Sequence, residues 1–419
     1  MSVDKLEPYA SYKDSGIEWL GEIPSHWNLT RNKDIFFERG SLSQSGDETL
    51  LTVSHITGVT RRSEKNVNMF MAETMEGYKH CKTGDLVINT MWAWMGALGT
   101  AREDGICSPA YGVYAPRRGL PYSHGYFDYL YRTPKAVLEM TRNSKGIVSS
   151  RLRLYPKDFF QILTALPSYE EQVAITAYLD TKTGQIDRQI DLLGQKVKKY
   201  GELKKSLINH VVTRGLDKAI PRKDSCVEWI GEIPVHWTVL RLKDICTIEK
   251  GEVFDFVAEE GVVPYLNGGM TPSGYSNKSN MPSGVIAVSE GGASSGYTQF
   301  MDIPFWCGAH CYAIFPKAKC QKYIFYCIKG LEHVLSELKT GSAMPNLKRA
   351  EISNFLIPIT LHRDEQTAIA AYLDDKTSQI DRIVNAFNTQ IDNFKELRKT
   401  LINDVVTGKI RVVDERPVV

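Results

Sequence analysis

The chain has 419 residues, of which 42% are hydrophobic and 24% charged, an ordinary composition for a globular protein with room for two or three domains. A formal net charge of +2 excludes a surface that is basic throughout, as in proteins that coat nucleic acids, although a nearly neutral chain can still carry local basic faces. Residues 1–14 lack the apolar core of a signal peptide, and no apolar run approaches the roughly 18 residues of a membrane span. We therefore expect a cytoplasmic protein with no membrane partner.

The stretch KDSGIEWLGEIPSHW at residues 13–27 occurs again as KDSCVEWIGEIPVHW at residues 223–237. Farther on, EQVAITAYLDTKTGQIDR from Glu171 matches EQTAIAAYLDDKTSQIDR from Glu365, and ELKKSLINHVVT from Glu202 matches ELRKTLINDVVT from Glu396. The chain is therefore two copies of one unit, the second somewhat shorter. The middles, 36–169 and 246–363, share only an apolar skeleton. We expect the similar ends of the two copies to bind the same kind of partner, and the dissimilar middles to bind two different ones.

The repeated stretch near the start of each copy is predicted to be a junction where a helix end meets a globular domain. Its tryptophans are most simply packing residues. Its histidines have no carboxylate or cysteine pattern near them in the sequence, so we interpret them as structural too. The residues concerned are Trp19, Trp27, Trp229, Trp237, His26 and His236.

Each middle has short apolar strands, turn-forming Gly and Pro, and polar aromatic loops, which predicts a mixed α/β, β-rich domain. TGDLVINT from Thr83 matches SGVIAVSE from Ser283, and CSPAYGVYAP from Cys107 matches CGAHCYAIFP from Cys307. The eight cysteines form no C-x-x-C pair, and a zinc site at CGAHC would need two more ligands at a matching spacing.

Three loops differ most between the copies and are rich in Arg, Lys, Asn, Ser and Tyr, the side chains that contact base edges and phosphates in the major groove. For any one of these residues the alternative is a solvated loop. The candidate DNA contacts are Arg61, Arg62, Lys65, Asn89, Trp92, Arg102, Lys145, Ser149, Arg151 and Arg153 in the first copy, and Asn267, Ser273, Tyr275, Asn277, Lys278, Ser294, Ser295, Tyr297, Lys339, Asn346 and Lys348 in the second.

After each middle, apolar residues recur at alternating steps of four and three, the pattern of helices that pack along their length. About forty residues without proline would span roughly 60 Å, more than one small domain covers. If the two seams pair, the second helix runs antiparallel to the first and returns the C-terminus to the first junction. The alternative is an amphipathic helix lying on its own domain. The seam positions are Ile186, Ile190, Leu193, Val197, Tyr200, Leu207 and Val211 in one helix, and Ile380, Val384, Phe387, Ile391, Phe394, Leu401 and Val405 in the other.

None of three catalytic patterns is complete in the sequence. GGASSGYT resembles a phosphate-binding glycine loop, but Tyr297 stands where the lysine would follow Gly296. SPAY at Ser108 resembles the short motif with which adenine methyltransferases hold a flipped base, but Ala110 replaces its second proline and no glycine-rich cofactor strand precedes it. A nuclease-like acidic cluster with lysine is absent as well. We expect no catalytic, cofactor-binding or metal residues in this chain.

Two variable middles, each preceded by W-x-GEIP-x-HW and followed by a helix that opens with Glu-Gln and AYLD, resemble the specificity subunit of Type I restriction-modification enzymes over essentially the whole chain. The resemblance implies a non-catalytic DNA-binding scaffold for a bipartite target, two half-sites separated by an unspecified spacer. It also implies two modification subunits, which bind S-adenosylmethionine and methylate adenine, and through them two restriction subunits, which use ATP and Mg. The other hypothesis is a coiled-coil adaptor whose two heads bind proteins.

The predicted organisation has five segments. Residues 1–169 form a first target recognition domain that includes the junction 13–35, and residues 170–214 form a first coiled-coil helix. Residues 215–363 form a second recognition domain that includes the junction 223–245. Residues 364–409 form the second helix, and 410–419 a C-terminal tail. The expected fold is thus two mixed α/β domains linked by two helices in an antiparallel coiled coil, with a pseudo-twofold internal repeat.

Overall fold

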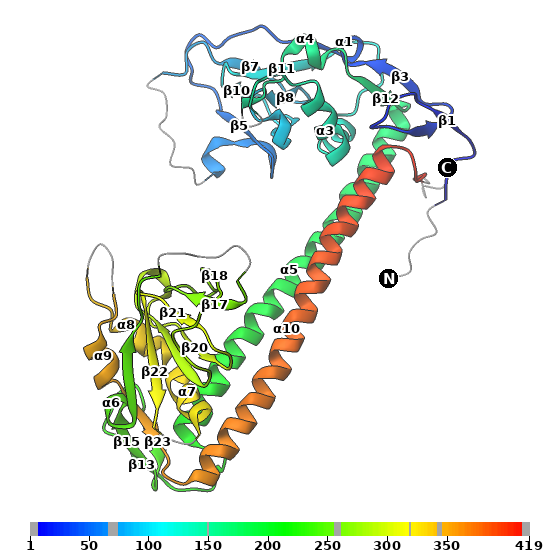
Figure 1. Ribbon diagram of the computed structural model, residues 1–419. Helices are drawn as coiled ribbons and strands as arrows, with labels where there is room; N and C mark the ends of the chain where they lie inside the picture. Colours follow the sequence, from blue (N-terminus) through cyan, green and yellow to red (C-terminus); the bar gives the residue numbers. More distant parts are fainter. Residues whose placement is uncertain are drawn as a thin grey trace. The chain divides into compact units, whose positions relative to one another are not determined.

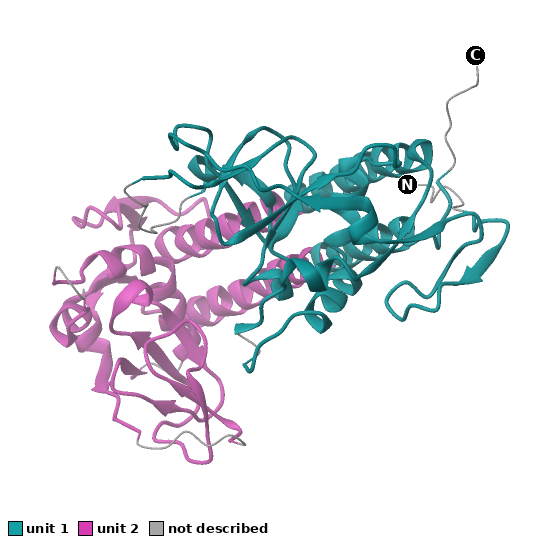
Figure 2. Cartoon of the chain, turned by 90° about the horizontal axis from the view of Figure 1, so that it is seen from above, with its two compact units in different colours: residues 1–192, 390–419 teal, residues 193–389 magenta. Residues whose placement is uncertain are grey.

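The computed structural model describes residues 7–65, 74–148, 151–254, 261–317, 320–341 and 346–412. The chain divides into two compact units, unit 1 (1–192 and 390–419) and unit 2 (193–389). Each unit contains a globular part and one stretch of each of two long helices, α5 (Tyr169–Arg214) and α10 (Arg363–Val406) (Figures 1 and 2). Most of the predicted tail 410–419 lies outside the described residues.

The globular part of unit 1 is built on a four-stranded antiparallel sheet in the order β4-β11-β8-β9. Helix α2 packs against β9, and the Thr133 side chain caps the next helix, α3, which begins with Pro134. Smaller two-stranded sheets pair β1 with β2, β3 with β12, β5 with β6 and β7 with β10. The bounds are β1 Tyr12–Asp14, β2 Glu22–Pro24, β3 Asn28–Arg31, α1 Asn32–Ile35, β4 Phe36–Glu38, β5 Leu51–Ser54, β6 Gly58–Arg61, β7 Lys79–Cys81, β8 Leu86–Asn89, β9 Leu98–Thr100, β10 Gly105–Cys107, β11 Tyr111–Pro116, α2 His124–Tyr131, α3 Pro134–Arg142, α4 Pro156–Phe159 and β12 Leu163–Leu166.

Unit 2 repeats this plan with the sheet β16-β22-β19-β20 and helix α7 packed against β20. Every residue of the central strand β19 is buried, which fits its apolar run VIAV before the closing Ser289. The bounds are β13 Arg222–Asp224, β14 Glu232–Pro234, β15 Thr238–Arg241, α6 Leu242–Ile245, β16 Cys246–Lys250, β17 Val263–Leu266, β18 Gly274–Ser276, β19 Val285–Ser289, β20 Thr298–Met301, β21 Trp306–Cys307, β22 Cys311–Pro316, α7 Gln321–Gly330, α8 Glu332–Glu337, α9 Arg349–Asn354 and β23 Leu356–Ile359.

The stretches of α5 and α10 pair in an antiparallel sense. In unit 2 the Lys204 ammonium lies 2.7 Å from the Asp381 carboxylate, and the rings of Tyr200 and Phe387 are 5.8 Å apart, so residue numbers rise in one helix as they fall in the other. In unit 1, Arg398 Nε lies 2.9 Å from the Asp187 carboxylate. The predicted pairing of the two seams is therefore confirmed within each unit.

Both helix ends are built into the globular cores. Val405 and Val406, at the end of α10, are fully buried in the core of unit 1, whereas Val212 of α5 is fully buried in the core of unit 2. Just beyond α10, the Tyr12 hydroxyl donates to the Lys409 carbonyl at 3.1 Å. The end of the second helix therefore lies against the first junction, as the sequence predicted.

Candidate nucleic-acid interface

The repeated AYLD motif fastens each long helix to its own globular part. The Tyr129 hydroxyl of α2 donates to Asp180 Oδ1 at 2.7 Å, and the Tyr326 hydroxyl of α7 donates to Asp374 Oδ1 at the same distance. In both copies the threonine three residues after the aspartate has its Oγ1 atom 3.3 Å from the same tyrosine oxygen. The repeated ends thus share a structural task, positioning the domain on the helix.

The glutamate that opens each long helix bonds a junction histidine. His26 Nε2 lies 3.1 Å from Glu171 Oε2, and His236 Nε2 lies 2.9 Å from Glu365 Oε2. Each glutamate stands more than a hundred residues from its histidine in the sequence, so no local sequence pattern indicated the contact. Burial opposes ionisation of Glu365, but hydrogen bonds from Thr360, His236 and the Trp237 indole outweigh it and hold the pKa of Glu365 below its ordinary value.

Three of the four junction tryptophans pack as predicted. Trp19, Trp27 and Trp237 are 4% exposed or less, but Trp229 is 40% exposed. In unit 1 the side chain next to Trp19, that of Glu18, forms a bidentate pair with Arg142, the last residue of α3, at 2.8 and 2.9 Å. The matching helix of unit 2, α8, has six residues where α3 has nine.

Several candidate contacts in unit 1 are held by other parts of the chain. Arg61 forms three hydrogen bonds of 2.6–2.9 Å with the Glu103 carboxylate. The Lys65 ammonium donates at 2.7 Å to the hydroxyls of Ser54 and Thr57, and burial, then the charges of Arg132 and Arg62, lower its pKa. Both side chains are therefore already engaged in contacts within the chain that support the β5-β6 hairpin.

Two other candidates of unit 1, Asn89 and Trp92, lie at or just after the end of β8, and the rest are placed on other segments. Asn89 is the last residue of β8, and Trp92 in the turn that follows is 51% exposed. Lys145 lies 3.1 Å from the Asp158 carboxylate but keeps 61% of its side chain exposed. Arg62 is half-buried, and the residues with exposed side chains are Arg102, Arg151 and Arg153, whereas Ser149 lies outside the described residues.

Most candidates of unit 2 are exposed, but Ser295 is not. Ser295 is 4% exposed and its hydroxyl donates to the Glu290 carbonyl at 2.9 Å, because a 3-10 turn over Gly292–Ser294 points it inward, away from the surface on which a DNA contact was expected. Ser294 donates to the Gly268 carbonyl. Burial raises the pKa of Tyr297, whose ring lies 4.2 Å from the Lys329 ammonium. The exposed side chains are those of Ser273, Tyr275, Asn277, Lys278, Lys339, Asn346 and Lys348, and Asn267 is half-buried.

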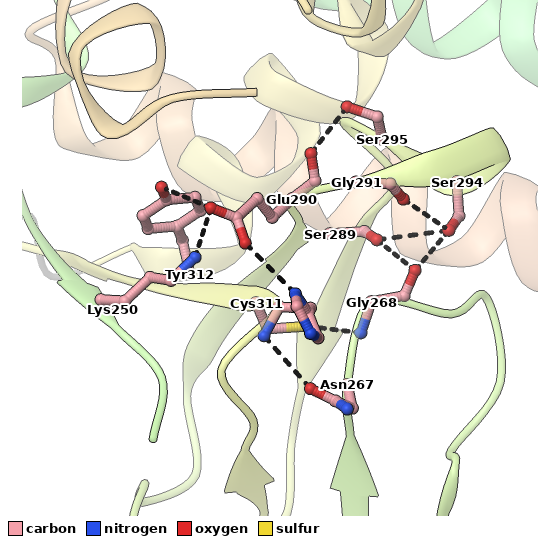
Figure 3. Close-up of polar contacts among 11 residues, drawn as sticks. Lys250, Asn267, Gly268, Ser289, Glu290, Gly291, Ser294, Ser295, Cys311 and Tyr312 are labelled. Atoms are coloured by element: carbon pink, nitrogen blue, oxygen red, sulfur yellow. Dashed lines mark hydrogen bonds and ion pairs between the residues drawn. The ribbon is translucent and has the colours of Figure 1, made fainter. Parts of the chain in front are cut away.

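A polar cluster at the end of β19, which the sequence did not reveal, centres on Glu290 (Figure 3). Its carboxylate pairs with the Lys250 ammonium, accepts a 3.1 Å hydrogen bond from the Tyr312 hydroxyl and lies 3.6 Å from His310 Nδ1. Burial, followed by the Glu290 charge, raises the pKa of Tyr312 to about 12. The Asn267 side chain accepts from the His310 backbone amide at 3.1 Å, so a candidate residue lies at the edge of this cluster.

At the corresponding place in unit 1 there is a cavity of about 180 Å³. The match is fixed by backbone bonds, because Asn89 N donates to Ala97 O as Ser289 N donates to Tyr297 O, both at 2.9 Å. Thr90 thus stands where unit 2 has Glu290. The lining residues are Glu38, Lys79, Thr90, Pro109, Ala110, Tyr111, Gly112, Arg153, Leu154, Tyr155 and Pro156. The same sheet edge therefore presents different chemistry in the two units.

Within the described residues, no three His, Cys, Asp or Glu side chains are placed to hold one metal ion. The buried pair Cys307 and Cys311 lies side by side, and the hydrogen bond with Cys311 together with burial raises the pKa of Cys307 far above its ordinary value. In the same parts of the chain, no helix is both long and apolar enough to cross a bilayer.

Comparison with known proteins agrees with this architecture. Residues 234–393 match the family model described as "Type I restriction modification DNA specificity domain". The chain is 28% identical over 321 residues to the Type I restriction enzyme MjaVIII specificity subunit of Methanocaldococcus jannaschii, covering 68% of this chain and 70% of that protein. It is 30% identical over 141 residues to a protein of Mycoplasma genitalium named as a type I specificity subunit, and the match spans only 37% of that protein's length.

Two solved structures share the fold. One comes from a study of complex assembly and conformational transition of the type I R-M system. It has a TM-score of 0.70 at 16% identity, and the match covers 93% of this chain and 99% of the other. The HsdS subunit from Thermoanaerobacter tengcongensis has a TM-score of 0.51 at 17% identity, covering 93% and 98%. The predicted fold class, two mixed α/β domains with two long linking helices, is confirmed, as is the resemblance to type I specificity subunits.

Proposed function

We propose that this chain is the non-catalytic specificity subunit of a type I restriction-modification system, in which each globular part recognises one half of a bipartite DNA target. The observation that carries the proposal is the repeated sheet edge. The same backbone plan ends in a cavity beside Thr90 in one unit and in the Glu290 cluster in the other. Two similar scaffolds with unlike polar edges suit two unlike half-sites.

The alike parts favour two equivalent partners. The tyrosine-aspartate and histidine-glutamate contacts occur once in each copy, so a protein that binds one junction meets similar geometry at the other. We assign two modification subunits to these surfaces, with two restriction subunits joined through them. S-adenosylmethionine would be bound by the modification subunits, and ATP and Mg by the restriction subunits.

A pool of random duplexes tests the proposal. The chain assembled with its modification subunits is mixed with the pool, and bound duplexes are recovered on a filter and sequenced. We expect enrichment of one motif with two specified parts and an unspecified gap. A two-headed adaptor that binds proteins would enrich no motif. Methyl transfer from labelled S-adenosylmethionine to DNA by the purified chain alone would contradict the non-catalytic assignment.

A further inference from the structure

In both units a loop returns to the end of the central strand through a matched backbone bond. Leu154 N donates to Thr90 O at 2.9 Å, and Leu347 N donates to Glu290 O at 2.7 Å. Thr90 and Glu290 directly follow the last residues of β8 and β19. Both leucines are buried, at 1% and 0% exposure, so each loop is anchored in its core at an equivalent position.

The residue before each anchor has its backbone fixed and its side chain exposed. Arg153 exchanges two backbone hydrogen bonds of 2.9 Å with Lys145, and Asn346 exchanges two of 3.0 Å with Thr340. Among the described residues, neither the Arg153 nor the Asn346 side chain has a hydrogen-bond partner. Because the backbone is already fixed, little further conformational entropy is lost when the exposed polar side chain binds a ligand.

The surroundings suit the different lengths of these two side chains. A Cβ atom on Gly291 would lie 2.4 Å from Asn346 Oδ1, so the glycine leaves room for the short amide at the strand end. The corresponding residue of unit 1 is Met91, and there the longer Arg153 side chain lines the cavity instead. Lys145 and Lys348, both exposed, stand nearby in the sequence as candidate phosphate contacts.

We infer that Arg153 and Asn346 are the equivalent base-reading residues of the two units, Arg153 for guanine and Asn346 for adenine. This inference rests on the proposed DNA-binding function. The chemistry follows from the groove edges: a guanidinium donates twice, to guanine O6 and N7, whereas an amide both donates to adenine N7 and accepts from its N6 amino group. One half-site therefore contains a G·C pair read by Arg153, and the other an A·T pair read by Asn346.

The test exchanges the two chemistries in the full chain assembled with its modification subunits, with the random duplex pool as probe. Arg153→Asn should lower the guanine preference at one position of one half-site at least about tenfold, because the shorter amide cannot take the place of the guanidinium. Asn346→Arg should likewise lower the adenine preference at one position of the other half-site, because the longer side chain does not fit beside Gly291 as the amide does. Arg118→Asn is the matched control. Strand β11 begins at Tyr111, which lines the cavity beside Arg153, whereas the exposed Arg118 follows the other end of that strand, so its loss should leave the motif unchanged.

Arg153→Lys separates base reading from phosphate binding, because lysine keeps the charge but not the planar pair of donors. It should lose the guanine preference while nonspecific affinity stays within about twofold, and it also serves if Arg153→Asn does not fold. A wild-type half-site without a G·C pair, or variants that bind more weakly but keep the motif, would overturn the inference and leave the proposed function standing. A wild-type chain that enriches no motif would instead overturn the proposed function.

Discussion

The paired helices offer a direct way to alter the spacer of the proposed target. Asp187 and Lys204 are 17 residues apart in α5, and Asp381 and Arg398 are 17 residues apart in α10. Four residues inserted into each helix, after Lys196 and after Gln390, fall between these positions. Because both helices gain the same length, each ion pair can still form, and four residues turn roughly once around the helix, which nearly keeps the seam in phase.

The expected size of the effect follows from helix and duplex geometry. Four residues add about 6 Å of helix, and one base pair occupies roughly 3.4 Å along the duplex. The spacer should therefore grow by one or two base pairs while both half-site sequences stay unchanged. The assay is the spacer length in the methylated sites of genomic DNA that the assembled variant enzyme has modified.

A single insertion is the control. Four residues placed after Lys196 alone make the two segments unequal by about 6 Å, so one of the two ion pairs is lost and assembly should be destabilised. If the doubly extended enzyme is active with an unchanged spacer, helix length does not set the distance and the reasoning is wrong. If a half-site changes instead, the globular parts do not act independently of the helices.

Three further predictions concern local contacts. Tyr326→Phe removes the hydrogen bond to the Asp374 carboxylate and should destabilise unit 2 by about 1–2 kcal/mol in chemical denaturation, whereas an unchanged midpoint would show that this contact contributes nothing. The lowered pKa of Glu365 adds stability above the unfolded-state pKa, and that stability is lost as pH falls through the folded pKa. Glu365→Gln should therefore flatten the loss of thermal stability below about pH 4.5 relative to Glu396→Gln at an exposed site, and parallel pH curves would contradict it. Cys226 has a left-handed backbone (φ 59°) where the first copy has Gly16 (φ 69°), and a Cβ atom on Gly16 would meet no other atom within 4 Å, so backbone strain alone separates the two residues. Cys226→Gly should therefore stabilise by about 0.5–1 kcal/mol and Gly16→Cys should do the opposite in thermal melts, and equal melting temperatures would contradict it.

The fold could be predicted from the sequence because of the repeat: two copies of one pattern indicate which apolar positions form cores and seams. Ile186 and Ile380, predicted at equivalent places in the seams, are 9% and 7% exposed. The candidate interface was harder to predict, because the exposure of a loop residue depends on the conformation of the turn that carries it. Ser295 turns inward, and the partners of Arg61 and His26 come from distant segments. The cluster around Glu290 draws on three strands, a proximity that sequence spacing does not express.

The central claim is that each globular part recognises one half-site independently of the other. Replacing residues 36–169 with the equivalent segment of another type I specificity subunit, and then mapping methylated adenines in genomic DNA modified by the assembled chimera, tests this most directly. We predict that one half of the recognised motif changes to that of the donor protein while the other half and the spacer remain those of the parent chain. An active chimera in which both halves change together, or in which neither changes, would contradict the account.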